Sequence, residues 1–139
     1  FLHAGTYAGI GFGNAGTGYV HAMSYSFGAT YHVPHGEANY TLFMAVFKTY
    51  QKLDPNGKIK NLNRELAQLL GCREESVYEE LDKVLNIILK LKPLKAYGTK
   101  ESDLSVFTSN TVEKQTRLTA NGYIQFTPEQ VLDIYKSVF

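Results

Sequence analysis

The chain holds 139 residues with a formal net charge of +1 and a single cysteine. This length suits one domain with its own core, and the lack of any Lys/Arg block argues against nucleic acid or an anionic membrane as a partner. Cys72 has no partner for an internal disulfide, and the longest apolar run, residues 42–47, is far shorter than the roughly 18 residues of a membrane-spanning helix. A cytoplasmic protein is expected.

The first 36 residues contain no Asp, Glu, Lys or Arg, yet they hold eight of the 12 glycines and all 4 histidines. A helix at the protein surface normally carries charged residues on its solvent-facing side. This stretch has none, so we expect it to be buried on all sides. The rest of the chain could bury part of this stretch. A second domain, a cofactor or another subunit, as in a homodimer, could bury what remains. The chain also begins without an initiator Met or a helix cap, which suggests a C-terminal piece of a longer enzyme.

Residues 1–15 are rich in Gly and Ala, and small residues at helical spacing predict close helix packing. The small residues are Ala4, Ala8, Gly11 and Ala15. The same stretch contains a G-x-G-x-x-G pattern, with an acidic Glu37 about 20 residues further on, as a dinucleotide-binding turn would have. No strand pattern precedes it, so we interpret the match as coincidental.

The next segments predict helices joined by recognisable turns. Residues 18–26 predict a helix that ends near Gly28, and residues 31–34 a loop. Residues 36–52 are apolar almost all round, which is typical of a buried central helix, and residues 54–57 (Asp-Pro-Asn-Gly) predict a turn.

The second half of the chain also predicts helices. Residues 61–70 form a short helix that Gly71 ends, and residues 100–116 a weaker helix. A capping box at residues 127–130 begins the last helix. Two apolar stripes face inward: Val77, Leu81, Val84, Leu85, Ile88 and Leu89 before Pro93, and Val131, Leu132, Tyr135 and Val138 in the last helix. Strand patterns are nearly absent, so the predicted fold is a single all-α helical bundle over residues 1–139.

Two histidines occupy positions that core packing does not require. His21 lies inside an apolar helical run and His35 begins the next one. Gly28 and Pro34 between them should interrupt the helix, so the two imidazoles can fold back toward one point, as metal ligands do. The alternative is that each histidine is a hydrogen-bonded core residue. His3, His32 and Glu37 are further candidate ligands, although Glu37 is better explained as an acidic partner of a helix N-terminus.

Two other classes of function are considered, a metal-dependent hydrolase and a helical scaffold. A metal-dependent hydrolase should carry an acidic general base beside its ligands, and His21 has none within four residues. A helical scaffold would merely pack its histidines and hold no metal. Nucleophilic catalysis is not supported, because Cys72 follows a helix-ending glycine among charged residues, far along the chain from every histidine.

The run GNAGTGYVHAMSYSFGATYHVPHGEAN, residues 13–39, resembles the metal-binding signature of the iron-dependent (group III) alcohol dehydrogenases. That signature is N-A-x-x-G-x-x-H-A followed, fourteen residues after its histidine, by the histidine of P-H-G-x-x-N. Residues 24–25, 30–36 and 39–40 are most similar to the members that act on 4-hydroxybutyrate. The similarity extends through the C-terminal helices.

The resemblance implies the C-terminal metal-binding domain of a dehydroquinate synthase-like fold. His21 and His35 would be two of four ligands to Fe²⁺ or Zn²⁺, with an Asp and a His supplied by a preceding region. That region would also contain the NAD-binding domain, so no residue of this chain is assigned to NAD. The implied reaction is hydride transfer between NAD and a small-molecule substrate, 4-hydroxybutyrate, which gives succinate semialdehyde. A short primary alcohol or diol is the alternative substrate.

One departure from the family concerns Tyr25, which stands where many members carry a second histidine facing the nicotinamide. Tyr25 lies four residues after His21 and therefore on the same helical face. Tyr25 is our candidate catalytic residue. A buried substrate carboxylate would need a charged or multiply hydrogen-bonding partner. The candidates are Tyr31, His32, Lys114 and Arg117.

Overall fold

The computed structural model describes all residues 1–139 and contains eight α-helices and no strand, so the predicted all-α fold is confirmed. The helices are α1 (Leu2–Ala15), α2 (Tyr19–Tyr31), α3 (His35–Leu53), α4 (Lys58–Leu70), α5 (Val77–Ile88), α6 (Glu101–Ser109), α7 (Thr116–Thr119) and α8 (Pro128–Ser137). Two 3₁₀ turns, η1 (Glu74–Ser76) and η2 (Leu94–Tyr97), and one π-helical segment, η3 (Asn110–Lys114), lie between them. No helix combines the length and the hydropathy that crossing a bilayer requires.

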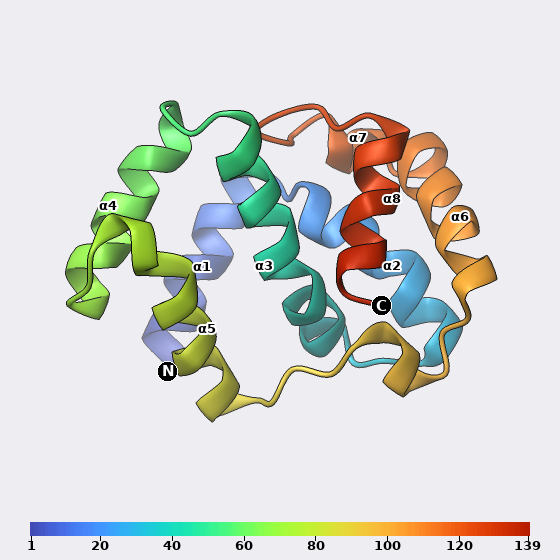
Figure 1. Ribbon diagram of the computed structural model, residues 1–139, viewed down its shortest axis with the longest axis horizontal. Coiled ribbons are helices and arrows are strands. Elements are labelled where there is room, and N and C mark those ends of the chain that lie inside the picture. The colour runs from blue at the N-terminus through green and yellow to red at the C-terminus, as the bar shows by residue number, and fades with distance from the viewer.

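α3 is the central helix, as its apolar sequence predicts. α2, α6 and α8 lie on one side of it, and α4 and α5 lie on the other (Figure 1). The closest pairing is between the consecutive helices α2 and α3. This pairing positions the two histidines, because one lies in each helix.

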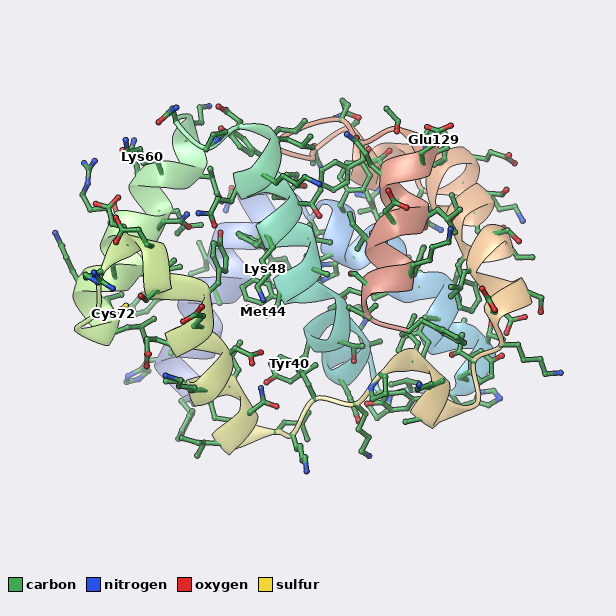
Figure 2. All side chains as sticks on the ribbon, viewed as in Figure 1. Tyr40, Met44, Lys48, Lys60, Cys72 and Glu129 are labelled. Atoms are coloured by element: carbon green, nitrogen blue, oxygen red, sulfur yellow. The ribbon has the colours of Figure 1, made fainter.

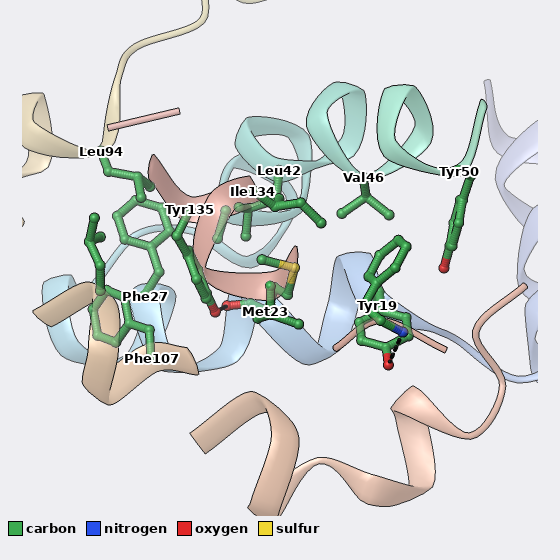
Figure 3. Packing of buried hydrophobic residues seen from close by; sticks show 14 of the residues in the cluster. Tyr19, Met23, Phe27, Leu42, Val46, Tyr50, Leu94, Phe107, Ile134 and Tyr135 are labelled. Carbon is green, nitrogen blue, oxygen red and sulfur yellow. Dashed lines mark hydrogen bonds between the residues drawn. The ribbon is translucent and has the colours of Figure 1, made fainter. Parts of the chain in front are cut away.

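The main core fills the space between α2, α3, α6 and α8. Its fully enclosed side chains include Met23 and Phe27 of α2, Leu42 of α3 and Tyr135 of α8, each 0% exposed (Figure 3). Burying an aliphatic or aromatic side chain of this size stabilises a fold by roughly 1.5–3 kcal/mol. The relative placement of these helices is therefore fixed by a continuous apolar cluster.

A smaller core joins the opposite face of α3 to α4 and α5. Met44 of α3 points toward these helices (Figure 2) and packs with Ala67, Val77 and Tyr78. Cys72, which follows α4, is a partly buried free thiol at the edge of this cluster.

Several predicted helix boundaries are confirmed. Gly71 ends α4 with φ of 66°, a left-handed conformation that glycine adopts without strain. Before α8, the Thr127 hydroxyl accepts a hydrogen bond from the Gln130 backbone N–H, while the Gln130 side chain accepts one from the Thr127 N–H. Pro128 occupies the first turn, as expected.

The prediction that a helix ends near Gly28 is wrong, because α2 continues through Gly28 to Tyr31. Gly28 has no positive φ and lies inside the contact between α2 and α3, where a Cβ would lie 3.4 Å from Ala38 Cβ, so it does not break the helix. The chain turns later, at His32, whose φ of 52° is left-handed, and at Pro34.

The single helix predicted over residues 100–116 is also wrong in detail. α6 ends at Ser109 and continues as the π-helical segment η3, and α7 begins at Thr116. Thr111 lies at the centre of this change and is 0% exposed. Its hydroxyl donates to the Phe107 carbonyl at 2.8 Å and lies 3.0 Å from the Tyr135 hydroxyl.

Within this chain, the expected cover is present over much of α2 and absent over α1. No residue of α1 is buried, and Leu2, Tyr7, Ile10 and Phe12 are each more than half exposed. Gly11 and Gly13 lie inside this helix with no strand before them, so the glycine pattern is indeed coincidental. The stripe on α5 is only half buried, because Val84, Ile88 and Leu89 face solvent.

Candidate metal centre

The centre is built where α2 and α3 pack against each other. His21 is partly buried in the first turn of α2, and His35 is the exposed first residue of α3. Their ring centroids are 5.1 Å apart. The chain reversal at residues 32–34 thus brings together two side chains that are fourteen positions apart in the sequence.

Asn39 connects the two rings. Its amide nitrogen Nδ2 lies 3.3 Å from His21 Nε2 and 3.0 Å from His35 Nε2. An amide nitrogen can only donate hydrogen bonds, so both Nε2 atoms act as acceptors here and each ring carries its proton on Nδ1. The two Nε2 lone pairs therefore converge on one point.

The amide of Asn39 is itself held by Ser24. The Ser24 hydroxyl donates to Asn39 Oδ1 at 2.6 Å, and Ser24 is 1% exposed. This contact leaves Nδ2 directed toward the histidines. Sequence reasoning assigned no role to either residue, although their spacing contained the information: Ser24 is three residues after His21 and Asn39 four after His35, each on the histidine's own helical face.

Burial and the neighbouring His35 lower the pKa of His21. Desolvation is the larger cause, and the second imidazole adds electrostatic repulsion between the protonated forms. Both effects favour the neutral ring, which is the form that binds metal ions.

A hollow of about 320 Å³ opens beside the histidines. Its lining is mostly small and apolar, with one imidazole and one phenol at the edge: Ser24, Tyr25, Gly28, Ala29, Val33, His35 and Ala38. The Tyr25 ring centroid lies 6.0 Å from that of His35, and the residue is 38% exposed. Tyr25 is thus at the mouth of the hollow and is not packed in the core.

The other candidate ligands lie apart from this pair. No group of three or more His, Cys, Asp or Glu side chains is placed to hold a metal ion. His3 and His32 are exposed on α1 and on the turn after α2. Glu37 accepts a hydrogen bond from the Tyr97 hydroxyl at 2.6 Å, and burial together with this bond raises the pKa of Tyr97 to about 12.

The structure distinguishes among the four residues that were predicted to bind a substrate carboxylate. Tyr31 is not brought to the hollow: its hydroxyl donates to the Asp103 carboxylate, which raises the pKa of Tyr31, and its ring packs against Phe27 and Phe107. Exposed His32 and Arg117 line no hollow beside the histidines. Lys114 lines a second hollow that Tyr25 also borders.

The two histidines fit half of a metal site. Their converging Nε2 lone pairs match the preference of Zn²⁺ and Fe²⁺ for imidazole nitrogen, at bonds of about 2.0–2.1 Å for zinc. Catalytic sites typically offer three or more protein ligands, and this chain brings two imidazoles to the point.

The chain is similar in sequence to several known dehydrogenases. The chain is 48% identical over all 139 residues to 4-hydroxybutyrate dehydrogenase of Clostridium kluyveri and covers 38% of that protein's length. It is 34% identical over 132 residues to alcohol dehydrogenase 4 of Schizosaccharomyces pombe, covering 93% of this chain and 30% of the relative. It is 32% identical over 110 residues to 1,3-propanediol dehydrogenase of Klebsiella pneumoniae, covering 73% of this chain and 27% of the relative.

The chain therefore spans between 27% and 38% of the length of these relatives. The C-terminal model of the Fe-containing alcohol dehydrogenase family matches residues 1–139. From the full-length match and the similarity to these dehydrogenases, the chain belongs to the Fe-containing alcohol dehydrogenase family.

Proposed function

We propose that this chain is the metal-binding part of an NAD-dependent alcohol dehydrogenase that interconverts 4-hydroxybutyrate and succinate semialdehyde. The convergence of the His21 and His35 Nε2 atoms on one point, marked by Asn39 Nδ2, is the observation that carries the proposal. The 48% identity to 4-hydroxybutyrate dehydrogenase supports the substrate.

His21 and His35 would hold the metal, Fe²⁺ or Zn²⁺, together with ligands from outside these 139 residues. When bound, the metal supplies Lewis-acid polarisation of the substrate oxygen, and NAD, held by a separate domain, accepts the hydride. Asn39 must then give up its contacts with the two Nε2 atoms, while its bond from Ser24 can persist. The protein would work in the cytoplasm, where the free thiol of Cys72 stays reduced; a homodimer stays a prediction.

The hollow beside the histidines gives this chain its part in substrate handling. Gly28 has no side chain and those of Ala29 and Ala38 are small, so these residues leave space for a short carbon chain and offer it an apolar surface. Tyr25 at the mouth can hydrogen-bond the substrate oxygen or the nicotinamide. Its role is to orient, and we place no proton transfer on it.

The test is to measure metal content and NAD reduction in the native protein and in three variants. The native protein should hold one Fe²⁺ or Zn²⁺ per chain and reduce NAD with 4-hydroxybutyrate. His21→Ala and His35→Ala should lose both properties, whereas His3→Ala, which changes an exposed histidine on α1, should keep them.

Other outcomes discriminate the alternatives. Full metal and activity in His21→Ala would show that the ligand assignment is wrong. A scaffold would hold no metal in the native protein. A hydrolase would hold metal without reducing NAD, and the engagement of Glu37 by Tyr97 leaves this chain no acidic general base beside the histidines.

A further inference from the structure

A second hollow, of about 330 Å³, lies next to the one beside the histidines. It is formed by α2 on one side and by the π-helical segment η3 on the other. Its lining residues are Tyr25, Ser26, Ala29, Thr30, Asn110, Lys114 and Gln115. Tyr25 and Ala29 line both hollows, so the two spaces adjoin along one face of α2.

The charged groups that line this second hollow are of one sign, positive. Lys114 is its one charged residue, and no carboxylate lines it. Lys114 takes part in neither of the two ion pairs of the chain, Arg64–Glu74 and Lys83–Glu80. A lysine without an acidic partner, facing a space without acids, is available to an anion.

The neutral groups around Lys114 are also free to bind. The side chains of Ser26, Thr30, Asn110 and Gln115 make no hydrogen bond within the protein, and all four can donate one. Together with the ammonium group, they form a set of donors facing one space. A carboxylate has four lone-pair positions and is the ligand that such a set suits.

The π-helical segment places this set. π-helical turns are rare and are frequently found at functional sites. Asn110 and Lys114, the two ends of the segment, both reach the hollow. The segment is tied to α2 through Tyr135, whose hydroxyl lies 3.0 Å from Thr111 Oγ1 and donates to the Met23 carbonyl at 2.7 Å (Figure 3).

We infer that Lys114, with the amides of Asn110 and Gln115, binds the carboxylate of an ω-hydroxycarboxylate whose hydroxyl end lies in the hollow beside the histidines. This inference rests on the proposed function and specifies which residue selects the substrate. Lys114 is preferred to Arg117, because Lys114 lines the second hollow whereas Arg117 lines neither hollow. A simple alcohol of the same length lacks the group that Lys114 recognises.

The test compares 4-hydroxybutyrate with 1-butanol in the native, metal-loaded protein and its variants. A hydrogen bond to a charged group corresponds to about 10- to 100-fold in affinity. Lys114→Met should therefore raise KM for 4-hydroxybutyrate by about 10- to 100-fold more than it changes KM for 1-butanol. Lys114→Arg should restore most of the selectivity. Lys136→Met, an exposed lysine on α8, is the matched control and should leave both substrates as they are.

Two results would overturn the inference while the proposed function stands. One is an equal loss on both substrates in Lys114→Met, and the other is a selective loss in Arg117→Met with none in Lys114→Met. Thermal melts of each variant show whether the fold is intact, and Lys114 is exposed, so its replacement should not disturb folding.

A binding measurement separates the inference from the proposed reaction. Calorimetric titration of the native protein with butyrate should give a carboxylate affinity that Lys114→Met weakens at least about tenfold. If the protein oxidises neither substrate but this loss is observed, the proposed function fails and the carboxylate site stands. If butyrate does not bind, or binds Lys114→Met equally well, the carboxylate site is wrong.

Discussion

Ser24 and Asn39 face each other across the contact between α2 and α3, with the serine hydroxyl donating to the asparagine Oδ1 at 2.6 Å. Neither residue is ionisable, yet their bond determines which end of the amide faces the two imidazoles. The arrangement of the histidines thus depends on a buried serine one turn along α2. This dependence can be measured.

Ser24→Ala should lower the free energy of unfolding by about 1 kcal/mol, because Asn39 Oδ1 loses its donor in a partly buried place. Urea denaturation followed by circular dichroism gives this value. Ser105→Ala removes a serine hydroxyl that bonds only to a carbonyl of its own helix on the exposed face of α6, and it should cost under about 0.5 kcal/mol. Equal losses in the two variants would contradict the structural role of Ser24.

Tyr25→Phe should reduce kcat/KM of the native protein roughly two- to tenfold, which corresponds to the loss of one hydrogen bond of about 0.5–1.5 kcal/mol. The residue is 38% exposed, so removing its hydroxyl should leave the melting temperature nearly unchanged. A packing role predicts the opposite pattern, with full activity. Steady-state kinetics and a thermal melt of the same preparation distinguish the two roles.

Asp103 should make stability depend on pH in the acidic range. Its carboxylate accepts hydrogen bonds from the Tyr31 hydroxyl and the Lys100 N–H, which lower its pKa below the ordinary value of 3.8. Because the folded-state pKa is depressed, the stabilisation is present above pH 3.8 and is lost as the pH falls through the lower folded value.

Asp103→Asn should therefore be less stable than the native protein at pH 6, and its stability should fall less steeply below about pH 4. Urea midpoints between pH 6 and pH 3 measure both effects. Asp133→Asn is the control, since Asp133 is exposed and its carboxylate makes no hydrogen bond or ion pair. Parallel pH curves for Asp103→Asn and the native protein would rule out the contribution of Asp103.

Tyr135→Phe should lower the free energy of unfolding by about 1–3 kcal/mol, because the buried Met23 carbonyl loses the hydrogen bond that the Tyr135 hydroxyl donates. Tyr135 is 0% exposed, and burial raises its pKa strongly, so it stays neutral across the working range of pH. Tyr7→Phe, on the exposed face of α1, should be silent in the same denaturation experiment. A loss under about 0.5 kcal/mol in Tyr135→Phe would contradict the bridging role.

The helices could be predicted because their signals are local. The capping box at Thr127, the left-handed Gly71 and the apolar face of α3 each act within a few residues, so the sequence contains them directly. The failures have tertiary causes. Gly28 predicts a helix end, but it lies inside a continuous helix against Ala38 of α3, and the π-helical turn contains Thr111, which lies 3.0 Å from Tyr135 of another helix.

In the candidate site, too, local features could be predicted from the sequence and tertiary ones could not. Spacing and the turn at Pro34 indicated that His21 and His35 could meet, and the structure places their rings 5.1 Å apart. Spacing could not distinguish Lys114 from Tyr31 or Arg117, because their positions follow from the path of α6, η3 and α7. The roles of His21, His35 and Lys114 stay predictions.

The solvent exposure of α1 has a consequence for backbone dynamics. α1 carries four glycines, Gly5, Gly9, Gly11 and Gly13, and each weakens a helix by about 0.5–1 kcal/mol relative to alanine. An uncovered helix of 14 residues is marginal in water even with better helix formers. Its amide protons should exchange with solvent almost as fast as those of an unfolded chain, while those around Met23 and Phe27 stay protected. Slow exchange in α1 would then report directly that another surface has packed against it.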